Sequence, residues 1–391
     1  MANIQTTRRE FLRQSSLGLT SLTFPLTTFI KNNGMTDTFD NYEEALKKPL
    51  EVKTLSFSFN DSYHPYTKSL PDERIKTLIN LEKLIISGYK GEYMNLPNEI
   101  GELKKLDELS IYSENLIEIP KAVWTLNSLT VLFLEINSLK DDDLKLSNLT
   151  QLESFAIKLH KTETIPDNIF DNANLTRFYI QSDDLEVIPN HFDRLFNLNH
   201  LSLHCQNLKV IPDTISNLKN LKKIDIYNKT ATSIDINFKL LEELKEFRWG
   251  QSLFFPLSLT NAKNLKILKF DVSYFETIDA DELVFQNLEQ FEITLSKLKK
   301  IPKCFETLQG VQSLILDINN FEEIEFDFHK LTNLTFLSFR RCENFEKIDM
   351  KKFIVSLQTI KSLKYLETPI LSKQQDTIKK EYNFDFDWTE E

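Results

Sequence analysis

A leucine pattern that returns every 23 residues is the feature of this sequence that most constrains its fold. The motif Leu-x-x-Leu-x-Leu, with a few substitutions, begins at twelve positions, and nine of the eleven intervals between them are 23 residues long. Because self-similarity at a fixed period of this length is typical of solenoids, we expect each unit to bury its apolar side chains against its neighbours. The motif starts are Leu81, Leu106, Leu129, Leu152, Leu175, Leu198, Leu221, Leu244, Leu265, Leu288, Val311 and Leu334.

The spacing inside each copy predicts a short strand followed by a return segment. Leu-x-Leu alternation puts two leucines on one face of the strand and the intervening residues on the other. The second half of many copies contains Ile-Pro, as at Ile211-Pro212, and proline favours the start of a helical or irregular turn. We therefore expect an α/β solenoid with a parallel sheet on its concave side and helical or irregular segments on its convex side.

This repeat resembles the 23-residue subtype of the leucine-rich repeat family, LxxLxLxxNxLxxIPxxIxxLxx. Good copies are LTRFYIQSDDLEVIPNHFDRLFN (175–197) and LNHLSLHCQNLKVIPDTISNLKN (198–220). The resemblance covers nearly everything from about residue 40 to 370 and implies a leucine-rich repeat horseshoe, with repeats over 51–370. It implies protein binding only at the level of the fold, because a fold does not fix a function.

The copies depart from the family pattern in two ways. The family's asparagine, which ties adjacent turns, is present as Asn137 and Asn319 but is replaced elsewhere, for example by Ser296 and by Cys342. An Asn or Asp often stands one place later instead, so we expect somewhat irregular turns. The repeat that begins at Leu244 has only 21 residues, and we expect it to kink the stack locally.

The two ends of a solenoid need caps, because they otherwise expose the core. Residues 37–50 predict an N-terminal capping helix with Tyr42, Ala45 and Leu46 facing inward and Pro49 ending it. Residues 351–391 depart from the period, and 371–391, which end in NFDFDWTEE, indicate a C-terminal cap and an acidic tail. This tail could also dock a partner.

The first 34 residues differ from the rest of the chain. They carry four basic residues and one acid, so the remainder has a net charge of −14. The segment TRREFLR (7–13) and the uncharged run after it (14–30) resemble a twin-arginine export signal. We interpret residues 1–34 as such a signal or as a disordered leader.

Export would place the protein in the periplasm or cell envelope, and without it the protein is cytoplasmic. No A-x-A cleavage site follows the leader. The leader therefore stays attached, as the chain's only membrane contact, or Met35 is the true start.

Composition argues against several kinds of chemistry. The 7 glycines include no phosphate-binding loop, and the net charge of −11 argues against nucleic acid. The 3 cysteines lie far apart and predict neither a disulfide framework nor a metal knuckle. His200 and His204 share a strand face about 13 Å apart, too far to hold one ion. We expect no catalytic residues, no metal and no cofactor.

The positions between the motif leucines are the informative ones, because they point off the concave face. Aromatic side chains gather there on neighbouring strands, flanked by charges, and such residues dominate binding hot spots. We predict exposed side chains and a protein or peptide partner bound by a monomeric scaffold. An exported receptor for a glycan or cell-wall component is the alternative, because aromatic faces also stack on sugars. The candidate partner-binding residues are Tyr112, Phe133, Tyr179, His204, Asp225, Tyr227 and Arg248.

Overall fold

The structure, a computed structural model, describes residues 37–59, 70–88, 94–113, 116, 118–137, 139, 143–324, 326–370, 375–376 and 387–389. The leader over 1–34 and most of the tail over 371–391 lie outside these residues. The described strands form one parallel sheet, sixteen strands in chain order. They are β1 (Thr38–Phe39), β2 (Thr54–Phe59), β3 (Lys83–Gly88), β4 (Glu108–Tyr112), β5 (Val131–Ile136), β6 (Ser154–Leu159), β7 (Arg177–Ser182), β8 (His200–Cys205), β9 (Lys223–Tyr227), β10 (Glu246–Gly250), β11 (Ile267–Asp271), β12 (Gln290–Thr294), β13 (Ser313–Ile315), β14 (Phe336–Ser338), β15 (Tyr365–Glu367) and β16 (Asp387–Thr389).

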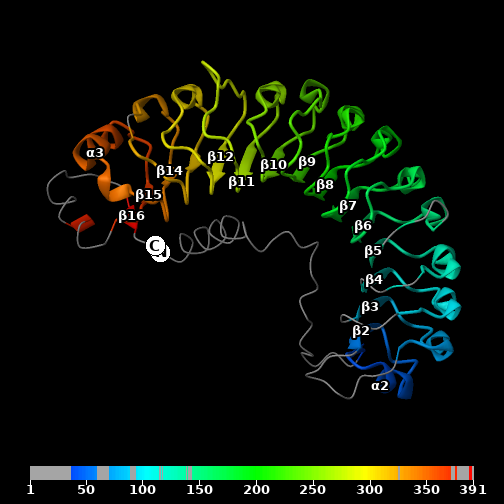
Figure 1. The fold of residues 1–391 in the computed structure, drawn as a ribbon. Helices are drawn as coiled ribbons and strands as arrows, with labels where there is room; N and C mark the ends of the chain where they lie inside the picture. The colour runs from blue at the N-terminus through cyan, green and yellow to red at the C-terminus, as the bar shows by residue number, and fades with distance from the viewer. Residues whose placement is uncertain are drawn as a thin grey trace.

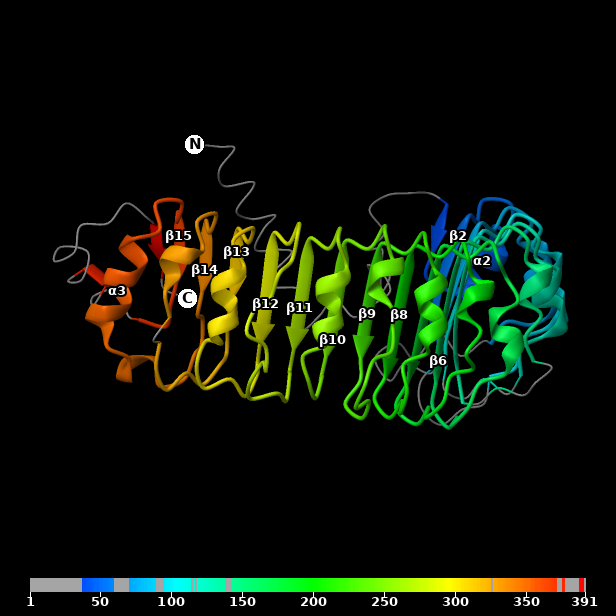
Figure 2. The same cartoon turned by 90° about the horizontal axis from the view of Figure 1, so that it is seen from above.

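The predicted horseshoe is confirmed. The strands line the inner side of the arch and the return segments form its outer side (Figure 1), and the view from above shows the strands side by side (Figure 2). Equivalent motif positions pair across the sheet, as Leu201 pairs with Phe178 on one side and Ile224 on the other. The wider outer side bends the stack toward the strands.

Short 3-10 helices make most of the outer side. Prolines precede several of them, including Pro120, Pro212 and Pro302, because a fixed φ suits the residue before a helical turn. They are η2 (Glu73–Thr77), η3 (Asn98–Glu102), η4 (Lys121–Thr125), η5 (Leu146–Asn148), η6 (Asp167–Phe170), η7 (Phe192–Arg194), η8 (Asp213–Asn217), η9 (Phe238–Leu240), η10 (Leu257–Asn261), η11 (Lys303–Thr307), η12 (Phe328–Lys330) and η13 (Phe345–Lys347).

The core runs the length of the solenoid between the sheet and the return segments. All twelve motif-opening residues are at most 1% exposed. Phenylalanines from successive repeats fill the space behind the leucines, as Phe170 packs edge-on against Phe178 and Phe192 at 6.2 and 5.0 Å between ring centroids. Trp249 stands at a leucine position and is fully buried. The repeats therefore bury their apolar groups collectively, as stacking units must.

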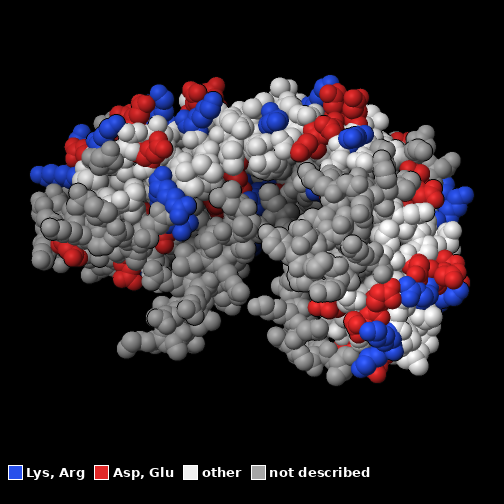
Figure 3. Space-filling model, turned by 60° about the horizontal axis from the view of Figure 1, so that its bottom comes forward, with Lys and Arg blue, Asp and Glu red and all other residues white. Residues whose placement is uncertain are grey.

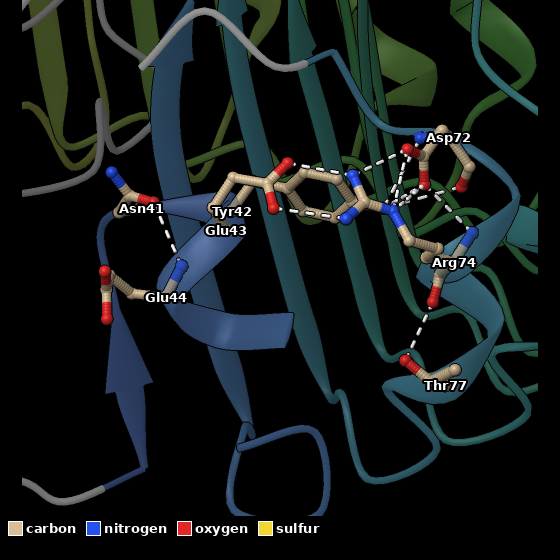
Figure 4. Close-up of polar contacts among 7 residues, drawn as sticks. All are labelled: Asn41, Tyr42, Glu43, Glu44, Asp72, Arg74 and Thr77. Atoms are coloured by element: carbon tan, nitrogen blue, oxygen red, sulfur yellow. Dashed lines mark hydrogen bonds and ion pairs between the residues drawn. The ribbon is translucent and has the colours of Figure 1, made fainter. Parts of the chain in front are cut away.

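Helix α2 (Tyr42–Lys47) covers the N-terminal end of the core. Asn41 caps it by accepting from the backbone N–H of Glu44. Tyr42 is 2% exposed, and the guanidinium of Arg74 lies 5.9 Å from the centre of its ring. Figure 4 shows the same guanidinium bonded to Glu43 and Asp72, which ties the cap to the first repeat. At the other end, α3 (Met350–Gln358) and β16 follow the last full repeat.

The turn after the strand takes two forms along the chain. We number positions from the first leucine of each motif and call the repeats that begin at 106–221 the N-terminal repeats. In these repeats the side chain at position 8 is buried, at most 4% exposed. Asn228 shows its role, because its amide donates to the carbonyls of Cys205 and Leu208 at 2.7 and 2.8 Å. The position-8 residues are Ser113, Ile136, Leu159, Ser182, Cys205 and Asn228.

The repeats that begin at 244–334, which we call the C-terminal repeats, bury position 9 instead. Their position-8 residues all have positive φ, from 51° to 61°, although none is glycine. Asn319 at position 9 donates to the carbonyls of Ile293 and Leu316, both at 2.9 Å. The left-handed residues are Gln251, Val272, Leu295, Ile318 and Arg341, and the buried ones after them are Ser252, Ser273, Ser296, Asn319 and Cys342.

The change occurs at the 21-residue repeat. Glu246 pairs with Lys223 before it and with Ile267 after it, so the strand register continues without interruption. The strands therefore show no break at this repeat, and the change is in the turn instead: Gln251 is the first non-glycine residue with positive φ in the part of the chain that the structure describes. In the N-terminal repeats the buried residue of the turn therefore stands one position before the family's asparagine, whereas the sequence suggested a residue one position after it.

Candidate functional site

The seven candidate residues lie on the concave face, on β4, β5 and β7 to β10. Their motif positions, 5 and 7, alternate with the buried leucines. The predicted exposure is wrong for four of them, because Phe133, Tyr179, His204 and Asp225 are only 6 to 8% exposed. Pairing of parallel strands in register places equivalent side chains against one another, and this lateral packing covers them.

An aromatic cluster occupies β4 to β7. Tyr112 stacks on Phe133 with 4.4 Å between ring centroids, and Phe133, Ala156 and Tyr179 form an apolar group separate from the main core. We call these four residues the concave aromatic cluster. Burial is the main cause that raises the pKa of Tyr112 and of Tyr179, so both phenols stay protonated at neutral pH.

A polar chain continues from this cluster into β9. The Tyr179 hydroxyl donates to Gln181 Oε1 at 2.8 Å and lies 3.2 Å from His204 Nδ1. On the other side of the ring, His204 Nε2 lies 3.6 Å from Asp225 Oδ2. This separation is longer than a typical hydrogen bond and within the range of an ion pair.

Asp225 is charged at neutral pH. Burial acts to raise its pKa, but His204, Arg248 and Lys223 outweigh that effect and lower it. Arg248 itself bonds to Asp271, and the nearby acids raise its pKa against the opposing effect of burial.

Tyr227 lies over the next strand. A Cβ added at Gly250 would lie 2.4 Å from Tyr227 Cδ2, so the ring fills the space of the missing side chain. The ring centroid is 6.1 Å from that of His204, whereas the Tyr179 and His204 centroids are 4.9 Å apart. Tyr227 thus leans toward β10 and remains half-buried, while Tyr179 packs closely on His204.

Sequence reasoning missed an ionic ladder that continues along the concave face from β11 onward. Lys269 pairs with Glu292 at 3.1 Å, and Arg340 pairs with Asp317 at 2.9 Å and with Glu367 at 3.4 Å. Burial raises the pKa of Glu292 and of Asp317 despite these partners. The charged residues could be read from the sequence at positions 5 and 7, but their pairing could not, because the partners are 23 to 27 residues apart.

Other kinds of site have little support among the described residues. Within them, no group of three or more His, Cys, Asp or Glu side chains is placed to hold a metal. No helix in the described part of the chain is long and apolar enough to cross a bilayer. On the face shown in Figure 3, acidic and basic side chains intermingle along the rim of the arch.

Comparison with known proteins finds likeness in structure. No family model matches the chain, and no curated protein matches it. A leucine-rich repeat protein from Leptospira interrogans matches with a TM-score of 0.56 and 20% identity, over 90% of this chain and 99% of that one. At this identity the likeness shows the fold, a leucine-rich repeat solenoid.

Two further structures have lower TM-scores. The internalin InlF from Listeria monocytogenes has a TM-score of 0.45 and 17% identity, over 75% of this chain and 82% of that one. A plant peptide hormone receptor in complex with RGF2 has a TM-score of 0.47 and 16% identity, over 84% of this chain and 57% of that one.

Proposed function

We propose that this protein is a non-enzymatic, monomeric scaffold that binds a protein or peptide partner on its concave face. The observation that carries the proposal is the concave aromatic cluster, which lies on the side of the sheet opposite the core. The leucines and phenylalanines behind the sheet already supply the core, so the fold does not require aromatic rings on this face. Phe133 and Tyr179 are already packed and hold the surface rigid, while the half-buried rings of Tyr112 and Tyr227 keep area that a partner can cover at low entropic cost.

Polar groups next to the cluster would give such a surface its specificity. His204, Asp225 and Arg248 stand within three adjacent strands of Tyr179. A partner that crosses the strands would contact the aromatic rings first and then these charged groups. Because the strands are held in register by the sheet and the core, little reorganisation would accompany binding.

Affinity capture from the native organism tests this proposal. The full chain is compared with a variant carrying Phe133→Ala, Tyr179→Ala and Tyr227→Ala, and with a control carrying Val187→Ala, Val210→Ala and Val284→Ala. The three valines are 52 to 60% exposed and lie outside the strands. We expect a protein that the wild type and the valine control retain and the aromatic variant loses.

Thermal unfolding must first show that the aromatic variant is folded, and Tyr227→Ala alone serves if it is not. Equal capture by all variants would contradict a concave site. Capture of no protein, together with binding to a glycan array that the aromatic variant abolishes, would favour the glycan receptor instead.

We also propose that the protein is exported by the twin-arginine route. The support is the segment TRREFLR (7–13) with its basic character and the uncharged run behind it. Residues 1–35 fused to a folded reporter should carry the reporter out of the cytoplasm. Replacing Arg8 and Arg9 with lysine should abolish this, and export that persists in the variant would contradict the proposal.

A further inference from the structure

Charged side chains on the concave face are arranged in pairs. From β3 to β15, every described Lys, Arg, Asp and Glu at position 3, 5 or 7 lies within ion-pair distance of a side chain on a neighbouring repeat, with one exception. Lys83 pairs with Glu108 at 2.6 Å, and Lys223 pairs with Glu246 at 2.8 Å. The other pairs are Glu135 with Lys158, His204 with Asp225, Arg248 with Asp271, Lys269 with Glu292, and Arg340 with both Asp317 and Glu367.

The exception is Arg177, an exposed residue on β7. Its guanidinium has no ion-pair or hydrogen-bond partner among the residues that the structure describes. Its in-register neighbours are Ser154 on one side and His200 on the other. The Ser154 hydroxyl has no hydrogen-bond partner, and burial is the main cause that lowers the pKa of His200, which is therefore neutral at neutral pH. No carboxylate faces Arg177 from the equivalent position on either strand.

An unpaired base on this face is unexpected from the composition. The chain has 58 acidic and 47 basic residues, so a charge left over after pairing would be expected to be an acid. A guanidinium binds a carboxylate through two parallel hydrogen bonds, whereas phosphopeptide sites use clusters of arginines. A single unpaired arginine therefore fits the carboxylate of a partner.

The half-buried rings of Tyr112 and Tyr227 lie within reach of a segment that binds Arg177. They stand on β4 and β9, and Arg177 stands on β7. With strands ~4.8 Å apart and a rise of ~3.3 Å per residue, the Cα of Arg177 is about 20 Å from that of Tyr112 and about 16 Å from that of Tyr227. About five or six residues of an extended segment cover either distance.

We propose that Arg177 binds the carboxylate of an aspartate or glutamate side chain in an extended segment of the partner. Apolar residues of the same segment cover the exposed part of the Tyr112 or Tyr227 ring. This inference rests on the proposed function and names the chemistry of its ligand, an acidic side chain near an apolar one.

Random 12-residue peptides displayed on phage and selected on the full chain test the proposal. The peptides that bind are synthesised, and each aspartate is replaced by asparagine and each glutamate by glutamine. We expect one acidic residue whose replacement weakens binding on the order of 10-fold. Arg177→Gln should cause the same loss, and the two changes together should cost little more than either alone.

Charge reversal sharpens this test. Arg177→Glu should bind a peptide in which lysine replaces the acidic residue more tightly than it binds the original peptide, because opposite charges then meet again. Arg194→Gln is the matched control, since it removes the other arginine of the same repeat, which is also exposed but lies on the outer side in η7. It should leave peptide binding unchanged.

The outcomes separate this inference from the proposed function. Peptides that lose affinity with Tyr112→Ala or Tyr227→Ala but not with Arg177→Gln would overturn the inference and leave the proposed function intact. Peptides insensitive to every concave variant, or no binding peptides at all, would count against both.

Discussion

The N-terminal repeats bury the side chain at position 8 of the motif and carry aromatic groups on the concave face. The C-terminal repeats bury position 9, place a left-handed residue before it and carry an ionic ladder. Both halves share one sheet and one register through β9, β10 and β11. The comparison teaches that the leucine spacing fixes the strands and the core. The conformation of the turn and the side chains on the concave face vary without changing that spacing.

The largest expected effect comes from the buried asparagines of the two turns. Asn228 and Asn319 each bond to two backbone carbonyls and also accept from backbone N–H groups. Asn228→Ala and Asn319→Ala should each lower the free energy of unfolding by about 3–5 kcal/mol, because buried groups lose their partners. Urea denaturation measures this.

The control for this prediction uses the same motif position in the other half. Lys229 stands at position 9, as Asn319 does, but it is exposed. Lys229→Ala should change stability by no more than about 0.5 kcal/mol. A similar loss for Lys229→Ala and Asn319→Ala would remove the distinction between the two turns.

Ion pairs provide the next comparison. Lys269 and Glu292 have side chains 15% and 5% exposed, whereas Lys299 and Glu322, 3.0 Å apart on the surface, are 63% and 60% exposed. Lys269→Met should cost about 2–3 kcal/mol because it leaves a buried carboxylate unpaired. Lys299→Met should cost about 0.5 kcal/mol or less. Equal urea midpoints for the two variants would show that the ladder does not support the C-terminal repeats.

Glycine should have opposite effects in the two turns. Val272 has a φ of 54°, which a β-branched residue adopts at a cost, while Ser182 at the same position in its repeat is outside the left-handed region. Val272→Gly should be about 1 kcal/mol more stable than Val272→Ala. Ser182→Gly should be about 0.5–1 kcal/mol less stable than Ser182→Ala. The same sign at both positions, measured by thermal unfolding, would contradict the two-turn description.

The smallest effect concerns pH. Burial raises the pKa of Asp317, so the folded state holds this proton more tightly than the unfolded state does. The stability of the wild type relative to Asp317→Asn should therefore increase as pH falls from about 7 toward the unfolded value of about 3.9.

Asp225, whose folded pKa is lowered, is the contrasting case. It contributes stability above its unfolded pKa, and that contribution is lost only as pH falls below about 3.9, through the folded pKa. The difference between the wild type and Asp225→Asn should stay flat from about pH 7 to pH 4.5. The urea midpoints of the wild type and of both variants are measured at each pH. The same pH dependence of the stability difference for Asp317→Asn and Asp225→Asn would contradict the prediction.

The sequence predicted the fold because one spacing recurs over almost the whole chain. Leucines at positions 1, 4 and 6 set the strands and the core, and they are buried as alternation requires. The left-handed residues carried no signal, since Val272 and Ile318 are poor candidates for positive φ and only the stacked neighbours hold them there. The sequence placed the candidate residues on the concave strands, where the structure also has them. Their burial and pairing could not be predicted, because Phe133, His204 and Asp225 are covered by side chains about one repeat away in sequence.

Photo-cross-linking in the native organism tests the proposed concave binding surface most directly. A benzoyl-phenylalanine replaces Tyr227, which is half-buried beside His204, and in a second variant it replaces Val284, which is 57% exposed between β11 and β12. Our account predicts a covalent adduct with one partner from position 227 and none with that partner from position 284. Adducts with the same partner from position 284 alone would contradict it.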